Sequence, residues 1–160
     1  MIKEFIDVVN EIRQLLPVWE SKLLALSVDD ITKSRNNQHR NIKQIIGHMV
    51  DSASNNTHRV IHLQYQPCPF EFPNYATYGN NDRWIEIQDY ETENWENLVQ
   101  FWKYIHLHFV HVIENIQDSK LDNKWITDSS GTTISLREMV IDFLKHFNLH
   151  LNEIADLIIM

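Results

Sequence analysis

Two histidines stand four residues apart near the C-terminus, at His146 and His150, inside a strongly helical pattern. Positions i and i+4 of an α-helix lie one above the other on the same face. Two imidazoles placed in this way can bind one metal ion, as in helical His-x-x-x-His zinc sites. Two solvent-facing histidines would show the same spacing, so a metal site requires a third ligand and a pocket from the rest of the chain.

The composition of the 160-residue chain argues against several classes of protein. A net charge of −8 disfavours binding to nucleic-acid phosphates and to acidic membrane surfaces. The charged start over residues 1–5 is unlike a signal peptide, and no apolar run approaches the ~18 residues that cross a membrane. The single cysteine, Cys68, cannot form an intrachain disulfide, which favours a reducing, cytoplasmic location.

Hydrophobic periodicity predicts four long helices, with no competing strand pattern. These helices cover residues 3–26, 42–65, 93–117 and 136–158. Pro17 predicts a kink or break in the first helix, because proline removes a backbone donor and clashes with the preceding turn. Asn41, Thr92 and Ser135 are the predicted N-caps of the other three. The sequence therefore predicts an all-α four-helix bundle, with residues 1–160 forming a single domain.

The connections between these helices predict their directions. Residues 66–91 open with three prolines within seven positions and are long enough to run the full height of a bundle. The flanking helices can therefore be parallel, whereas the shorter polar connector over residues 118–133 makes the last two antiparallel. It follows that the second and fourth helices run in opposite directions. Residues 27–40 are predicted to be a polar connection without a helix.

This topology brings His48 level with the C-terminal pair. His48 lies about 10 Å from the start of its helix, and His150 lies about 12 Å before the end of the last helix, at 1.5 Å per residue. Each belongs to a polar strip beside an apolar helix face, formed by His48, Ser52, Asn55, Asn56 and Arg59 and by Asp142, His146, His150 and Glu153. We interpret the strips as the two sides of a polar pocket, although solvated helix edges would give the same pattern.

Three neutral imidazoles leave a divalent ion with at least one open position for water or a substrate atom. An ion of this kind lowers the pKa of the water or thiol that it binds. Imidazole suits zinc, nickel, iron or copper, so the ligands do not select the metal. Asp142, Asn148 and Glu153 are the candidates for orienting the imidazoles.

Other catalytic motifs are absent from the sequence. It contains no Glu-x-x-His motif of a di-iron bundle, no His-Glu-x-x-His, no glycine-rich phosphate loop and no Gly-x-Ser-x-Gly elbow.

The remaining helical histidines are predicted to be structural or solvated. His58 and His62 form a second His-x-x-x-His pair that points away from the apolar face of its helix. His111 also points away from the core stripe, and His108 lies off the edge of that stripe. His106 is predicted to be a hydrogen-bonded residue at the flank of the stripe.

Three segments, in the same order along the chain, resemble motifs of the DinB/YfiT-like superfamily. They are Asn41-Ile42-Lys43-Gln44-Ile45-Ile46-Gly47-His48-Met49-Val50-Asp51-Ser52 with Asn55-Asn56-Thr57-His58-Arg59, then Asn81-Asp82-Arg83-Trp84-Ile85, and finally His146-Phe147-Asn148-Leu149-His150-Leu151-Asn152-Glu153-Ile154. The resemblance implies an up-down-down-up four-helix bundle with a long crossover loop between its second and third helices. It also implies a divalent metal bound through His48, His146 and His150. Arg40 and Asn152-Glu153 depart from the usual pattern, which often has tryptophan and glutamine there.

Members of this superfamily include S-transferases that use low-molecular-weight thiols, a thiol-dependent maleylpyruvate isomerase, and proteins described as metal-dependent hydrolases without a known substrate. The resemblance thus implies a zinc-, nickel- or iron-dependent enzyme acting on a small molecule, with a thiol S-transferase as the leading hypothesis. It also implies a homodimer and no contact with DNA. Metal-dependent hydrolysis and a non-catalytic bundle that binds a metal or ligand are the alternatives.

Two further features could contribute to the pocket. Arg59 could bind an anionic group of the substrate or thiol, or form an ordinary surface salt bridge. Trp84 and the segment Tyr75–Tyr90 could cover the pocket, or pack as an ordinary loop.

Overall fold

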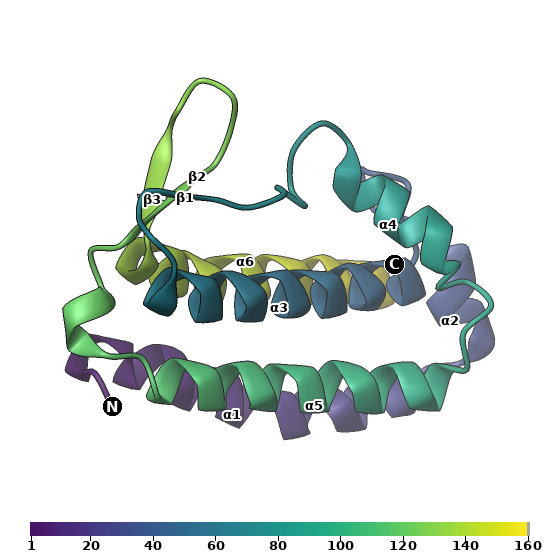
Figure 1. The fold of residues 1–160 in the computed structure, drawn as a ribbon. Helices are drawn as coiled ribbons and strands as arrows, with labels where there is room; N and C mark the ends of the chain where they lie inside the picture. The colour runs from purple at the N-terminus through teal and green to yellow at the C-terminus, as the bar shows by residue number, and fades with distance from the viewer. Residues whose placement is uncertain (160) are drawn as a thin grey trace.

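The computed structural model describes residues 1–159, in which four long helices pack in two layers (Figure 1). One layer contains α1 (Ile6–Leu24) and α5 (Trp95–Glu114), and the other contains α3 (Ile42–Tyr65) and α6 (Leu136–Ile159). α1 and α6 run in one direction and α3 and α5 in the other, which gives the order up-down-down-up. The predicted four-helix bundle is confirmed.

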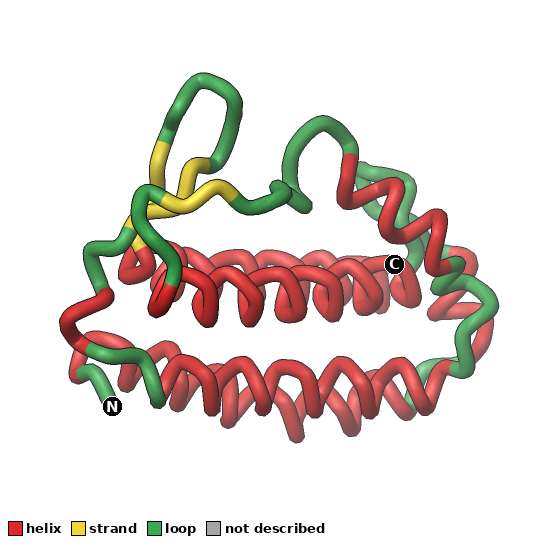
Figure 2. Tube along the Cα trace, viewed as in Figure 1, coloured by secondary structure: helices red, strands yellow, loops and turns green. Residues whose placement is uncertain are grey.

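Shorter elements occupy the connections between the long helices (Figure 2). In chain order they are a 3₁₀ turn (Lys3–Phe5), α2 (Val28–Lys33), β1 (Phe70–Glu71), α4 (Asn80–Gln88), a second 3₁₀ turn (Asp118–Lys120), β2 (Lys124–Ile126) and β3 (Thr133–Ser135). The chain between α3 and α5 returns along the outer side of the α3–α6 layer, carrying β1 and α4 with it. This connection therefore lies over the two helices that bear His48, His146 and His150.

Two of the long helices begin at the predicted N-cap residues. Asn41 and Gln44 form a reciprocal capping box at α3, with both hydrogen bonds 3.0 Å long. Ser135 and Glu138 form the equivalent pair at α6. The predicted cap of α5 at Thr92 is wrong, because its hydroxyl bonds to Asp89 in the preceding turn, and Asn94 caps the helix instead.

Two other expectations for the N-terminal half are wrong. A break at Pro17, one of the two predicted alternatives, is wrong because α1 continues through this residue. The lost hydrogen bond is outweighed by burial of the apolar face around Leu16 and Trp19. The connection over residues 27–40 contains α2, whose capping box joins Ser27 to Asp30. At six residues this helix is too short to show hydrophobic periodicity.

A small three-stranded sheet joins the two long connections, although the sequence predicted no strand. β2 pairs with β1 in parallel, placing Phe70 opposite Trp125, and with β3 antiparallel, placing Trp125 opposite Ile134. Strands of two or three residues carry too little alternation to be recognised. Trp125 is buried, so the sheet is held by tertiary packing.

The core lies between the layers, and α3 contacts both α5 and α6. The largest fully buried side chains include Phe5, Ile12, Leu16, Ile45, Ile46, Met49, Trp102, Phe109 and Phe147. Among the helices of residues 1–159, none has the combined length and apolarity needed to cross a membrane.

Tyr90 fastens the long connection to α3 just beside the candidate site. Its ring packs on Gly47, where an added Cβ would overlap the ring atoms. Its hydroxyl donates to Asp51 Oδ1 at 2.6 Å, and the Gln88 amide donates to the same oxygen at 2.8 Å. The absent side chain at position 47 therefore allows the connection to approach the helix.

Gly47→Ala is expected to destabilise the protein by about 1–3 kcal/mol, because overpacking a buried contact outweighs the gain in helix propensity of about 1 kcal/mol. Urea denaturation measures the change. In a Tyr90→Ala background the same substitution is expected to be neutral or stabilising, since the overlapping ring is gone. Equal effects of Gly47→Ala in the two backgrounds would contradict this account.

Candidate metal centre

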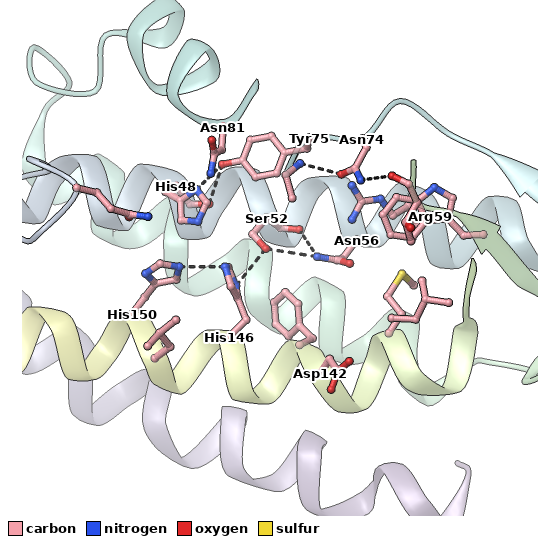
Figure 3. Close-up of a pocket in the computed structure, with 18 of the residues that line it drawn as sticks. His48, Ser52, Asn56, Arg59, Asn74, Tyr75, Asn81, Asp142, His146 and His150 are labelled. Carbon is pink, nitrogen blue, oxygen red and sulfur yellow. Dashed lines mark hydrogen bonds between the residues drawn. The ribbon is translucent and has the colours of Figure 1, made fainter. Parts of the chain in front are cut away.

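Three histidines from two helices converge at one side of a cavity (Figure 3). His48 comes from α3, whereas His146 and His150 come from successive turns of α6. Each offers a ring nitrogen within 4.8 Å of those of the other two, and the Nε2 atoms of His146 and His150 are 2.9 Å apart. The antiparallel directions of α3 and α6 thus bring the three residues to one level.

A polar side chain contacts the Nδ1 atom of each of the three imidazole rings. Nδ1 of His150 lies 2.8 Å from Glu153 Oε2, and Nδ1 of His48 lies 2.5 Å from the Tyr75 hydroxyl. Nδ1 of His146 has a longer contact, 3.5 Å, with Ser52 Oγ. These contacts orient the rings and leave Nε2 of each as the nitrogen available to a shared ligand.

Burial keeps the three imidazoles neutral at physiological pH. It lowers the pKa of His48 to about 2, assisted by the neighbouring His150 and His146, and lowers that of His146 to about 4. Burial also lowers the pKa of His150, although Glu153 opposes that shift. Neutral imidazole is the form that coordinates a metal, so the site is already in the protonation state that a cation requires.

The donor set fits a divalent ion with an open coordination position. Metal–nitrogen distances of about 2.0–2.1 Å place two imidazole nitrogens roughly 3.3 Å apart around a tetrahedral ion. The separations here, from 2.9 Å to at most 4.8 Å, bracket that value. Three nitrogen ligands facing a cavity suit zinc, nickel or iron and leave space for a further ligand.

The cavity beside the histidines has a volume of about 420 Å³ and extends along the groove between α3 and α6. α3 contributes a polar side through Ser52, Asn56 and Arg59. Besides its two histidines, α6 contributes the apolar Met139, Phe143 and Leu149 and the acidic Asp142 and Glu153. The connections complete the wall with Gln38, Arg40, Asn74, Tyr75, Ala76, Asn81, Trp125, Thr127 and Ile134.

The candidates for orienting the imidazoles are now distinguished by their contacts. Glu153 meets His150, as described above. Asp142 lines the cavity but pairs with Lys145 at 2.7 Å, and Asn148 donates to Glu11 of α1 at 2.7 Å. Only one of the three predicted candidates therefore touches a histidine of the cluster.

The covering segment differs from the prediction in one residue. Tyr75 lines the cavity and contacts His48. Trp84 does not line it and instead packs edge-on against Tyr75, with ring centroids 5.3 Å apart. Trp125 was not predicted to belong to the site, because a single aromatic residue in a connector gives no signal of where it folds back.

The other histidines lie outside the cluster. His58, His108 and His111 are exposed, as predicted. His62 is half-buried, because its ring stacks on Phe70 of β1, so the prediction of a solvated residue is wrong there.

His106 lies in the core, at 1% exposure, rather than at its flank. Its Nδ1 is 2.6 Å from the backbone carbonyl of Trp102, so the predicted hydrogen-bonded state holds.

Together these observations define a class: an up-down-down-up four-helix bundle with a three-histidine cluster at an open cavity. A solved structure of the same fold is YfiT from Bacillus subtilis, described as a probable metal-dependent hydrolase with an unusual four-helix bundle topology. The TM-score is 0.79 at 16% sequence identity, and the match covers 98% of this chain and 87% of that one. The predicted resemblance is thus confirmed for the fold. Comparisons with protein-family models and with curated proteins gave no match.

Metal-free protein is expected to lose stability in mild acid. Burial lowers the pKa of His106 and of His146 to about 4, so below pH 6.5 the unfolded chain binds protons that the folded chain does not. Each such histidine removes about 1.4 kcal/mol of unfolding free energy per pH unit between about 6.5 and 4. Burial raises the pKa of Asp51 to about 6, which opposes the loss below that pH, but one carboxyl is outnumbered by the buried histidines.

Urea denaturation at about pH 7 and pH 5, in the presence of a metal chelator, measures this loss of unfolding free energy. His106→Asn is expected to reduce the pH dependence by the share of one histidine, whereas His58→Ala, at an exposed position, leaves it unchanged. Equal unfolding free energies of the wild-type protein at the two pH values would show that the buried imidazoles are not held neutral.

Proposed function

We propose that the protein is a divalent-metal-dependent enzyme that transfers a group to the sulfur of a low-molecular-weight thiol. His48, His146 and His150 are the proposed metal ligands. The supporting observation is the convergence of three neutral imidazoles at the wall of an open cavity of about 420 Å³. Closed structural zinc sites use four protein ligands, whereas three ligands beside a cavity are typical of catalytic sites.

A divalent ion held there supplies one chemical effect, a lowered pKa of the thiol or water that it coordinates. The residues of the chain supply orientation. The three rings are positioned by their contacts with Tyr75, Glu153 and Ser52. Burial keeps the rings unprotonated. Zinc, nickel and iron all match the donor set.

Thiol transfer is favoured by the resemblance of three sequence motifs to a superfamily that contains thiol S-transferases. In such a transfer the thiol loses its proton, its sulfur bonds to an electrophilic carbon, and the leaving group departs with the electrons of the broken bond. The cavity offers a polar side at Ser52 and Asn56 and an apolar side at Met139 and Phe143, so it can hold a polar thiol beside a less polar substrate.

Metal-dependent hydrolysis at the same cluster is the second candidate. The description of YfiT as a probable metal-dependent hydrolase supports it, since the two chains share a fold. Hydrolysis would use the same three histidines with water in place of the thiol. Assembly as a homodimer and a cytoplasmic location stay predictions.

His48→Ala is expected to lower metal affinity more than about 100-fold, because it removes a direct ligand, whereas loss of an outer partner alone costs about 10–100-fold. Elemental analysis of protein purified without a nickel column should find about one divalent ion per wild-type chain and almost none in the variant. His58→Ala, an exposed histidine on the same helix, is the matched control and should keep the ion. Equal metal content in His48→Ala and wild type would remove the proposed site.

A substrate panel separates the two activities. Wild-type protein loaded with zinc, nickel or iron is expected to accelerate the reaction of a small thiol, such as cysteine or glutathione, with an activated aryl halide. The acceleration should vanish in His150→Ala, because the reaction depends on the three-histidine site. Hydrolysis of nitrophenyl esters without a thiol, equally lost in His150→Ala, would instead favour the hydrolase.

A further inference from the structure

Two buried arginines line the cavity, and only one of them forms an ion pair with a carboxylate. Arg40 and Arg59 are each only 5% exposed. Arg40 donates to the carboxylate of Asp82 at 2.5 Å, which pairs its charge. Within residues 1–159, no carboxylate pairs with Arg59, and its Nε and Nη2 atoms are buried without any hydrogen-bond partner.

The surroundings of Arg59 do not replace the missing anion. Its guanidinium lies 4.0 Å above the ring of Trp125, a cation–π contact that offsets only part of the cost of burying a charge. The acidic residues of the cavity wall are engaged elsewhere, Glu153 with His150 and Asp142 with Lys145. Burial lowers the pKa of Arg59 only to about 10, so the group remains a cation at neutral pH.

The position of Arg59 relates it to the three histidines. It lies eleven residues after His48 on α3, and Met139 lies eleven residues before His150 on the antiparallel α6. Figure 3 shows Arg59 at the far end of the cavity from the histidines. Helix geometry places Met139, which also lines the cavity, level with Arg59. A molecule lying along the groove would pass Phe143 and reach both ends.

The length of that molecule follows from helix geometry. Eleven residues span about 16 Å along a helix axis. The arginine side chain leans back toward the helix N-terminus, which shortens the separation between guanidinium and histidines to on the order of 10 Å.

We propose that the Arg59 end of the cavity is a carboxylate-binding subsite, which makes the substrate an organic carboxylate. Its apolar body lies against Phe143 and Met139, and about 10 Å separates its carboxylate from its reacting group. The guanidinium forms a planar fork that matches a carboxylate. A singly charged carboxylate balances the one cation, whereas a phosphate dianion would leave a negative charge in a buried site. The assignment of this molecule as the substrate rests on the proposed enzymatic function, but its binding does not.

Binding of eight-carbon probes to metal-free protein tests the subsite without relying on the metal. Octanoate is expected to bind at least tenfold more tightly than octanamide, which has the same shape without the charge, and more tightly than octylphosphonate. Calorimetry measures the affinities, and the indole N–H signal of Trp125, assigned with Trp125→Phe, should shift only when the probe reaches Arg59.

Arg59→Met is expected to abolish the preference for octanoate over octanamide. Arg13→Met, which alters an exposed arginine on α1, is the matched control and should keep the preference. Arg59→Met should also raise the urea midpoint of the ligand-free protein, because it removes an unpaired buried charge, whereas loss of a purely structural arginine would lower it. Metal content should be unchanged in Arg59→Met, so failure of the metal site and failure of this subsite give different results.

Three results would overturn the proposal. The first is equal affinity of wild-type protein for octanoate and octanamide, or no octanoate binding at millimolar concentration. The second is a preference for octanoate that survives in Arg59→Met. The third is tighter binding of octylphosphonate than of octanoate, which would reassign the subsite to a phosphate-like group.

Discussion

The opposite directions of α3 and α6 are the constraint on which the site depends. His48 lies near the beginning of α3, and His146 and His150 lie toward the end of α6, so parallel helices would place them at opposite ends of the bundle. The connection over residues 66–94 matters for this arrangement because it carries the chain back along the bundle and lets α5 run parallel to α3. Nearest neighbours joined by short loops would instead alternate in direction.

Burial has opposite consequences for the two kinds of charged group in the cavity. It keeps the imidazoles neutral, which prepares them for a cation without any competing proton. The same burial leaves the permanent charge of Arg59 without a partner, while Arg40 retains Asp82. Ligand-binding sites often retain groups that destabilise the free protein. A bound ligand can then pair with a charged group that has no partner in the folded chain.

The helices supply the histidines, but the connections supply much of what surrounds them. Tyr75 contacts His48 from one connection, and Trp125 lies beneath Arg59 from another. Loops held on a rigid scaffold commonly carry such functional contacts. The likeness to YfiT at 16% identity establishes a shared backbone, so the chemistry has to be argued from the residues of this site rather than from the fold.

Long-range periodicity in the sequence determined the four helices, and helix geometry then determined that His48, His146 and His150 share one level. The helix prediction holds because it rests on an apolar repeat over many residues. The prediction of a shared level holds because the rise per residue of a helix is constant. The short strands, α2 and α4 are too short to carry such a repeat. The choice of Glu153 over Asp142 depends on local side-chain conformation, because Glu153 contacts His150 and Asp142 contacts Lys145, each three residues away on α6. The isolation of Arg59 from every carboxylate of residues 1–159 was decided by tertiary structure, because it depends on side chains far apart in sequence.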